Sequence, residues 1–294
     1  MRLLHAIACC VAATCFSAPL QAQSIKWILQ DFPPAQIPVN GKPGPGFHDE
    51  ALRVIMAQWP EAEHSFVVAN SARTWFMLGE KEEACYVGAL QTPEREKVAY
   101  FTPFAVLPPL QLVVRKDTVA KLPLNADGEV ILSELLASPA LKGMLVDKRS
   151  YGKGLDEVIA QRSPKDAVMT IQAGDLGKTV PLMLAARRGD YTIEYDFILN
   201  YHKQQNEPLL EDLLSLPIAG FSKMLTTNVV CPRSPWGQKI IRRVDAILAR
   251  TVDSNGIRAG VEAWLSPETN RRYKADINAF VKNRKRPADA AQFE

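Results

Sequence analysis

The apolar positions of the chain change spacing along its length, and the first change lies near the N-terminal end. Residues 25–29, "IKWIL", form a short apolar run that is followed by a segment rich in Pro and Gly, residues 31–46. A short apolar run bounded by such breakers predicts a buried strand and then a loop. From Phe47 to Trp59 the apolar residues recur at helical spacing until Pro60, which predicts a helix.

The same alternation continues through the middle of the chain. Further strands are expected at 64–69, 84–90, 110–115, 143–147, 167–171 and 191–195, with helices expected near 72–80, 131–143, 151–162 and 179–190. Strands that alternate with helices favour parallel pairing, with the helices on the faces of the sheet. After residue 220 an extended run precedes a helix at 237–251 and two more helical stretches, at 257–265 and 273–281.

This order predicts an α/β protein with two lobes and a helical C-terminal section. The extended runs "LPPLQLVVR" and "LTTNVVCP" are interpreted as the two crossings between the lobes. Lobe one then comprises residues 24–107 plus 225–294, and lobe two comprises 108–224. Ligands of such folds bind at the carboxyl ends of strands and between domains.

The N-terminal segment, residues 1–22, is typical of a secretory signal peptide. Arg2 gives it a positive start, the apolar run from Leu3 to Phe16 is too short to span a bilayer, and "LQA" offers a cleavage site after Ala22. No later stretch is long and apolar enough to span a membrane. We therefore expect a soluble, exported, periplasmic protein.

Export changes what the cysteines indicate. Three of the five cysteines leave with the signal peptide, and Cys85 and Cys231 remain. In an oxidising compartment two cysteines favour one disulfide over two buried thiols. A disulfide between Cys85 and Cys231 is therefore expected, with a pair of unpaired buried thiols as the alternative.

Charge and motifs exclude several classes of protein. A formal net charge of +3 is too small to indicate nucleic-acid binding. No glycine-rich loop has a Walker or dinucleotide-binding pattern, and His48, His64 and His202 lack the spacing of metal ligands. We expect no cofactor, no metal site, no catalytic constellation and a monomeric chain.

Six segments, taken in order, resemble a known family. They are "DFPP", "GPGFHDEALRVI", "GALQTPEREKVAYFTPF", "MLVDKRSYGKGLDEVI", "AARRGDYTIEYDFIL" and "VVCPRSPWGQKIIRRVDAIL". The chain resembles the periplasmic type II solute-binding proteins of family 3, which bind polar amino acids, in a branch with two cysteines. The Thr-Pro-Glu-Arg segment is the most specific part of this resemblance, which covers nearly the whole chain after residue 22.

The resemblance implies roles for five residues. Arg95 occupies the place of the arginine that holds a ligand carboxylate; a surface ion pair with Glu94 or Glu96 is the alternative. Phe32 lies in the first cleft loop, and Tyr151 precedes a helix whose free backbone N–H groups suit an anion. Glu194 and Tyr195 straddle the place where the family carries an acidic group for an α-amine.

One position departs from the family pattern. Leu90 stands where the amino-acid binders carry a Ser or Thr five residues before the arginine. This substitution argues against an ordinary amino-acid site. It predicts a ligand held by charge at one end and by apolar or aromatic surface beside it.

The sequence therefore predicts a periplasmic solute-binding protein. It would capture a small carboxylate-bearing ligand between its lobes and serve a membrane transporter or a sensor. One alternative is a lyase- or dehydratase-like enzyme on the same fold, for which Glu194 is the only obvious acid or base. Another alternative is an accessory protein that has a degenerate cleft and binds another protein. The apolar Leu90, which lacks the hydroxyl of the family pattern, supports this alternative.

Overall fold

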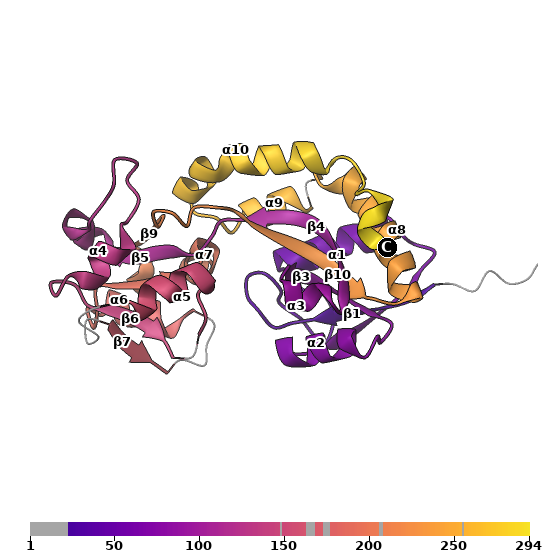
Figure 1. Ribbon diagram of the computed structural model, residues 1–294, viewed down its shortest axis with the longest axis horizontal. Coiled ribbons are helices and arrows are strands. Elements are labelled where there is room, and N and C mark those ends of the chain that lie inside the picture. Colours follow the sequence, from indigo (N-terminus) through magenta and orange to yellow (C-terminus); the bar gives the residue numbers. More distant parts are fainter. Residues whose placement is uncertain (1–22, 148, 163–167, 173–176, 206–207, 255) are drawn as a thin grey trace, which may run out of the picture.

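Two separate five-stranded sheets divide the chain into two lobes (Figure 1). This computed structural model describes residues 23–147, 149–162, 168–172, 177–205, 208–254 and 256–294. The expected signal peptide, residues 1–22, lies outside the described residues. Within those ranges the structure contains no helix that is long and apolar enough to cross a membrane.

The first lobe is built on a mixed sheet with the strand order β2-β1-β3-β10-β4. Its strands are β1 (Ser24–Leu29), β2 (Glu63–Val68), β3 (Ala84–Leu90), β4 (Ala99–Leu107) and β10 (Leu225–Pro232). β1 pairs in parallel with β2 and β3, whereas β10 is antiparallel to β3 and β4. Helices α1 (Phe47–Ala57), α2 (Ser71–Gly79) and α3 (Pro93–Glu96) complete this part of the chain.

The second lobe is built on a sheet with the order β7-β6-β8-β5-β9. The strands are β5 (Gln111–Arg115), β6 (Gly143–Val146), β7 (Val168–Ile171), β8 (Tyr191–Glu194) and β9 (Leu213–Leu216). Between them lie α4 (Leu132–Ala137), α5 (Lys153–Ala160), α6 (Thr179–Ala185) and α7 (Asp196–Gln204), with short 3-10 turns at Lys116–Lys121 and Pro208–Leu210. The first residue of the strand expected at 167–171 lies outside the described residues.

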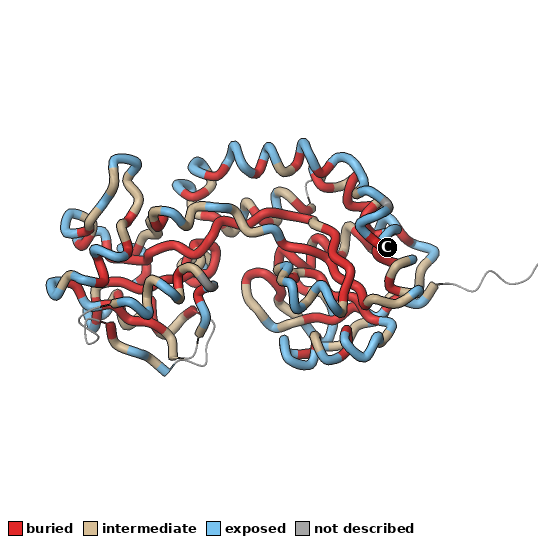
Figure 2. The backbone as a smooth tube through the Cα atoms, in the orientation of Figure 1, coloured by how far each residue is buried: buried red, intermediate tan, exposed pale blue. Residues whose placement is uncertain are grey.

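Two long neighbouring strands connect the first sheet with the second lobe: β4 leads toward that lobe and β10 leads back from it. β4 and β10 pair antiparallel over their whole length, from Leu107 opposite Leu225 to Ala99 opposite Pro232. Their backbone is almost continuously buried, as the red tube in Figure 2 shows. The sequence analysis predicts the extended run that became β10, but it does not predict β4 as a separate strand.

The C-terminal helices return to the first lobe. They are α8 (Pro235–Thr251), α9 (Arg258–Glu262) and α10 (Pro267–Arg284), followed by a 3-10 turn at Ala290–Phe293. Figure 1 shows α10 lying over the crossing strands. Arg284 at its end forms a buried ion pair with Asp245 of α8, 2.7 Å apart, and donates to the hydroxyl of Thr102 on β4. These contacts fix α10 to the first sheet.

Helix α7 forms a second connection between the lobes. It follows β8 of the second sheet, yet Phe197 is buried in the first lobe with its ring 5.7 Å from that of Phe47. The carboxylate of Asp196 accepts bonds from the backbone N–H and the hydroxyl of Ser266, at 2.8 and 2.9 Å. The sequence analysis does not predict α7 or β9.

The disulfide is confirmed. The Sγ atoms of Cys85 and Cys231 are 2.05 Å apart and their Cα atoms 4.4 Å apart. Because β3 and β10 are neighbours, the bond joins two adjacent strands of the first sheet. The alternative of two unpaired thiols is wrong.

Candidate functional site: a cleft between the lobes

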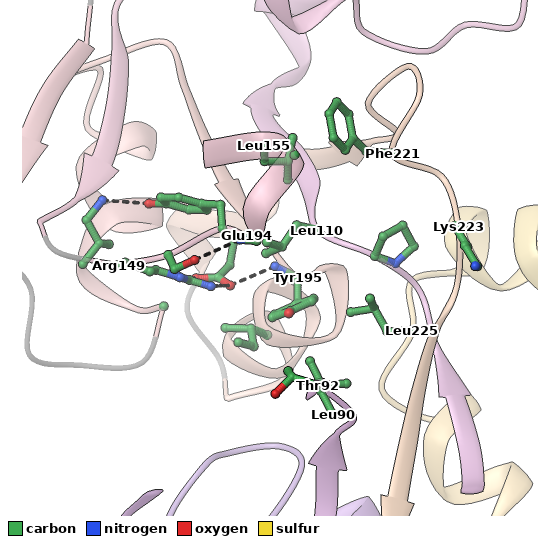
Figure 3. Close-up of a pocket in the computed structure, with 18 of the residues that line it drawn as sticks. Leu90, Thr92, Leu110, Arg149, Leu155, Glu194, Tyr195, Phe221, Lys223 and Leu225 are labelled. Atoms are coloured by element: carbon green, nitrogen blue, oxygen red, sulfur yellow. Dashed lines mark hydrogen bonds and ion pairs between the residues drawn. The ribbon is translucent and has the colours of Figure 1, made fainter. Parts of the chain in front are cut away.

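A cavity of about 1000 Å³ lies between the two lobes. One wall comes from the end of β3 and the turn after it, where Leu90 and Thr92 lie. The opposite wall comes from the end of β8, with Glu194 and Tyr195 (Figure 3). Both walls are therefore formed where strands end, as the sequence predicts for a ligand site.

Arg95 lies on the first wall and is held from two sides. Thr92 caps the short helix α3, with its hydroxyl 3.4 Å from the backbone N–H of Arg95. The Nη1 atom of Arg95 donates to the carbonyl oxygen of Leu90 at 2.8 Å, and the guanidinium lies 4.4 Å from the ring centroid of Trp75. An arginine stacked on an aromatic face loses less freedom when it binds a further group.

No carboxylate neutralises Arg95 among the described residues. The expected alternative, an ion pair with Glu94 or Glu96, does not form: Glu96 instead accepts a bond from the side chain of Gln91. Partial burial lowers the pKa of Arg95, but an arginine stays protonated in proteins. The remaining N–H donors of its planar head suit bidentate recognition of a carboxylate.

A second cavity of about 240 Å³ opens behind Arg95 inside the first lobe. It shares Phe32, Leu90, Arg95, Tyr195 and Leu225 with the larger cavity, so the two are adjacent. We call this smaller space the lobe-one chamber.

Two of the three predicted aromatic residues, Phe32 and Tyr195, line both of these spaces. The backbone of Phe32 exchanges two bonds of 2.9 Å with Gln36, which fix the first cleft loop. The ring of Tyr195 stacks on that of Phe197 at 4.9 Å and an interplanar angle of 14°. Both rings offer surface to a ligand, and whether they bind one stays a prediction.

Glu194 lines the cleft but already has a cationic partner. Its Oε2 and Oε1 atoms lie 2.5 and 2.7 Å from Nη1 and Nη2 of Arg149, a bidentate pair drawn in Figure 3. Oε1 also accepts the backbone N–H of Tyr195 at 2.9 Å. The carboxylate is 3% exposed, and Arg149 is 24% exposed. Burial opposes the charge of Arg149, but hydrogen bonding and attraction to Glu194 outweigh it and raise its pKa.

Sequence reasoning missed Arg149. It lies in the quoted segment "MLVDKRSYGKGLDEVI", a few residues after β6 ends. The signal that could have found it is a basic residue just past the carboxyl end of a buried strand, the same signal that singled out Arg95.

Tyr151 lines the cleft, and two backbone donors beside it are already used within its own turn. The backbone N–H of Tyr151 donates to Asp156 at 2.8 Å, and that of Gly152 donates to the hydroxyl of Ser150 at 3.2 Å. The hydroxyl of Tyr151 accepts the N–H of Val146 at 2.9 Å. Side chains of the same turn therefore satisfy these two donors, and an anion site at the N–H groups of the following helix, α5, stays a prediction.

The cleft carries an excess of positive charge. Among its described lining residues, Arg95, Arg149 and Lys223 are cationic and Glu194 is the only carboxylate. Over the part of the chain that the structure describes, no group of three or more His, Cys, Asp or Glu side chains is arranged to hold a metal. Positive charge therefore exceeds negative charge along the described lining of the cleft.

Comparison with known proteins identifies the fold. No family model matches the chain. No curated protein matches it either. Its structure is similar to the probable amino-acid ABC transporter extracellular-binding protein ytmK from Bacillus subtilis, with a TM-score of 0.62 and 14% identity over 84% of this chain and 100% of that one.

Two further solved structures that match this chain have different roles, one as a binding protein and one as a sensor domain. An ancestral cationic amino acid solute-binding protein matches with a TM-score of 0.61 and 14% identity, over 83% of this chain and 96% of that one. A histidine kinase sensor domain with similarity to periplasmic binding proteins matches with a TM-score of 0.54 and 17% identity, over 84% and 98%. This chain therefore has the type II fold of the periplasmic amino-acid-binding proteins, a fold that also serves as a sensor domain.

Proposed function

We propose that this chain is a periplasmic solute-binding protein that captures a small carboxylate-bearing ligand between its lobes. The observation that carries the proposal is Arg95, an arginine in the cleft that has no carboxylate partner among the described residues. Its head is oriented by Trp75 and by the carbonyl of Leu90, with donors left for a ligand. Arg95 is thus the main anchor, Phe32 and Tyr195 provide the aromatic surface beside it, and Tyr151 and Glu194 contribute from the second lobe.

Closure of the lobes would couple binding to a signal. A ligand that contacts Arg95 on one wall and residues of β8 on the other stabilises the closed arrangement over the open one. We propose that the moving units are residues 24–107 plus 225–294 and residues 108–224. The sheet membership of β4, β5, β9 and β10 supports these boundaries.

We propose a membrane transporter or a sensor as the partner that reads the closed form. The matched structures include a transporter's binding protein and a kinase sensor domain, and the predicted signal peptide supports export. Binding rather than catalysis is favoured because Glu194, the one acid or base suggested for a lyase, is held in a bidentate pair with Arg149.

A ligand screen on residues 23–294 tests this function. Thermal shift over organic acids, aryl and alkyl carboxylates, amino acids and short peptides should find a hit, since a ligand at about 100 times its dissociation constant adds roughly 2.7 kcal/mol of stability. NMR of each hit during prolonged incubation should show no turnover. A screen in which no anion binds would contradict the proposal, and turnover of a hit would favour the enzyme.

A further inference from the structure

Resting on the proposed function, we propose that the ligand is a carboxylate without an α-ammonium group, and that its uncharged, ring-sized substituent occupies the lobe-one chamber. Two independent features of the cleft lead to this class of ligand. One is that no described lining residue offers an ammonium group an unpaired carboxylate. The other is the chemistry of the chamber.

The described lining of the cleft offers no free carboxylate to an ammonium group. Across the described lining of both cavities, Glu194 is the only acidic side chain. Both of its oxygens bond to Arg149, and Oε1 also accepts the N–H of Tyr195. An ammonium brought into this cleft would lose its hydration next to cations and gain no counter-charge. Burying an unpaired charge is costly, so the amine is selected against.

The lobe-one chamber has the size for an aromatic ring. Its volume is about 240 Å³. An apolar cavity of about 150 Å³ in another protein already holds benzene. Aromatic side chains form much of its wall: Phe32, Trp75, Tyr86, Tyr195 and Phe197. Ring surfaces of this kind favour another ring over a flexible polar chain.

The chamber also contains polar groups without partners. His48 is 3% exposed, and neither of its ring nitrogens has a hydrogen-bond partner among the described residues. Thr227, 1% exposed, has an unpartnered hydroxyl oxygen. Both side chains line the chamber. Buried polar atoms are nearly always paired, so a polar substituent of the ligand would supply a partner that these groups lack.

His48 supplies no charge to the interior of the chamber. Burial lowers its pKa to about 3, so the imidazole is neutral at pH 7 and offers one donor and one acceptor. The ring of His48 packs closely against β3, because a Cβ on Gly88 would lie 2.3 Å from it. With Arg95 at its mouth, the chamber fits a carboxylate outside and an uncharged ring inside.

Isothermal titration with four probes tests the proposal on residues 23–294. They are 3-phenylpropanoate, 3-(4-hydroxyphenyl)propanoate, L-phenylalanine and propanoate. We expect 3-phenylpropanoate to bind at least about tenfold tighter than L-phenylalanine, which differs by the ammonium, and than propanoate, which lacks the ring. Equal or tighter binding of L-phenylalanine would overturn the amine-free class while leaving the proposed function intact. Equal binding of propanoate would overturn the occupied chamber.

A matched pair of variants locates the ring. The 4-hydroxyl group should tighten binding about tenfold in the parent protein, and Thr227→Val should remove most of that gain. Thr226→Val is the control, because Thr226 is exposed on the same strand and lines neither cavity. A hydroxyl that brings no gain, or a gain that Thr227→Val leaves intact, would overturn the placement. Binding of none of the four probes, with another carboxylate found in the screen, would reject this class but not the function.

Discussion

Arg95 and Arg149 face the same cleft from opposite walls, yet their environments differ. Arg149 shares two bonds with Glu194 and has its charge balanced within the protein. Arg95 is held by an aromatic ring and a backbone carbonyl, neither of which neutralises it. A cation that is paired with a carboxylate stabilises the protein around the cleft, whereas an oriented cation without a carboxylate partner is available to a ligand. The comparison shows that the surroundings of an arginine, more than its presence in a cleft, indicate its role.

The two walls also differ in how they are braced, and removing the disulfide should have the largest effect on stability. Cys85–Cys231 ties β3, which leads to Arg95, to the crossing strand β10 and closes a loop over a sequence separation of 146. We expect Cys85→Ala/Cys231→Ala to lower the free energy of unfolding by about 2–5 kcal/mol. Urea unfolding of oxidised parent and variant measures this. Unchanged stability would show that the bond does not brace this wall.

Breaking the Arg149–Glu194 ion pair should have the next largest effect on stability. Glu194→Gln leaves the largely buried Arg149 without a counter-charge, and we expect a loss of about 1–3 kcal/mol in unfolding free energy. Glu268→Gln is the matched control, because the Glu268–Arg271 pair lies on the surface, 64% and 71% exposed, and should cost under about 1 kcal/mol.

The same variant sharpens the comparison of the two arginines. With Arg149 released from Glu194, the cleft gains a further cation without a counter-charge, so a carboxylate ligand should bind more tightly than it does to the parent. Weaker binding, together with unchanged stability, would mean that Glu194 itself contacts the ligand.

A smaller effect should appear in the pH dependence of stability. Burial lowers the pKa of His48 to about 3, below the ordinary value of 6.5. Between these pH values the unfolded chain binds more protons than the folded one. The contribution of His48 to the free energy of unfolding is therefore complete above about pH 6.5 and is lost as the pH falls. His48→Phe should reduce the slope of the unfolding free energy against pH by up to about 1.4 kcal/mol per pH unit. An unchanged slope in urea unfolding between about pH 4 and 6 would contradict a neutral His48.

The alternation of strands and helices could be predicted because apolar spacing is a local pattern. The disulfide could be predicted because only two cysteines remain after residue 22, and the cleft position of Arg95 because its segment resembles that of a known family. Apolar period identifies β1 and α1, and the run "TPER" follows a buried strand directly. Sequence reasoning did not predict α7, whose Phe197 is buried by contact with Phe47 of the other lobe. It also could not predict the Arg149–Glu194 pair, whose members are 45 residues apart and meet only in the folded chain.

The affinity of Arg95 variants for the carboxylate identified by the screen tests the central claim most directly. By isothermal titration at low salt we expect Arg95→Ala to bind about 100-fold more weakly, which corresponds to roughly 3 kcal/mol for a charged bidentate contact. Arg95→Lys should also weaken binding substantially, because it keeps the charge but loses the planar fork. Arg73→Ala is the control, since Arg73 stacks on Phe76 at 5.1 Å outside both cavities. If Arg95→Ala binds as tightly as the parent and Arg73→Ala do, Arg95 is not the anchor and the account is wrong.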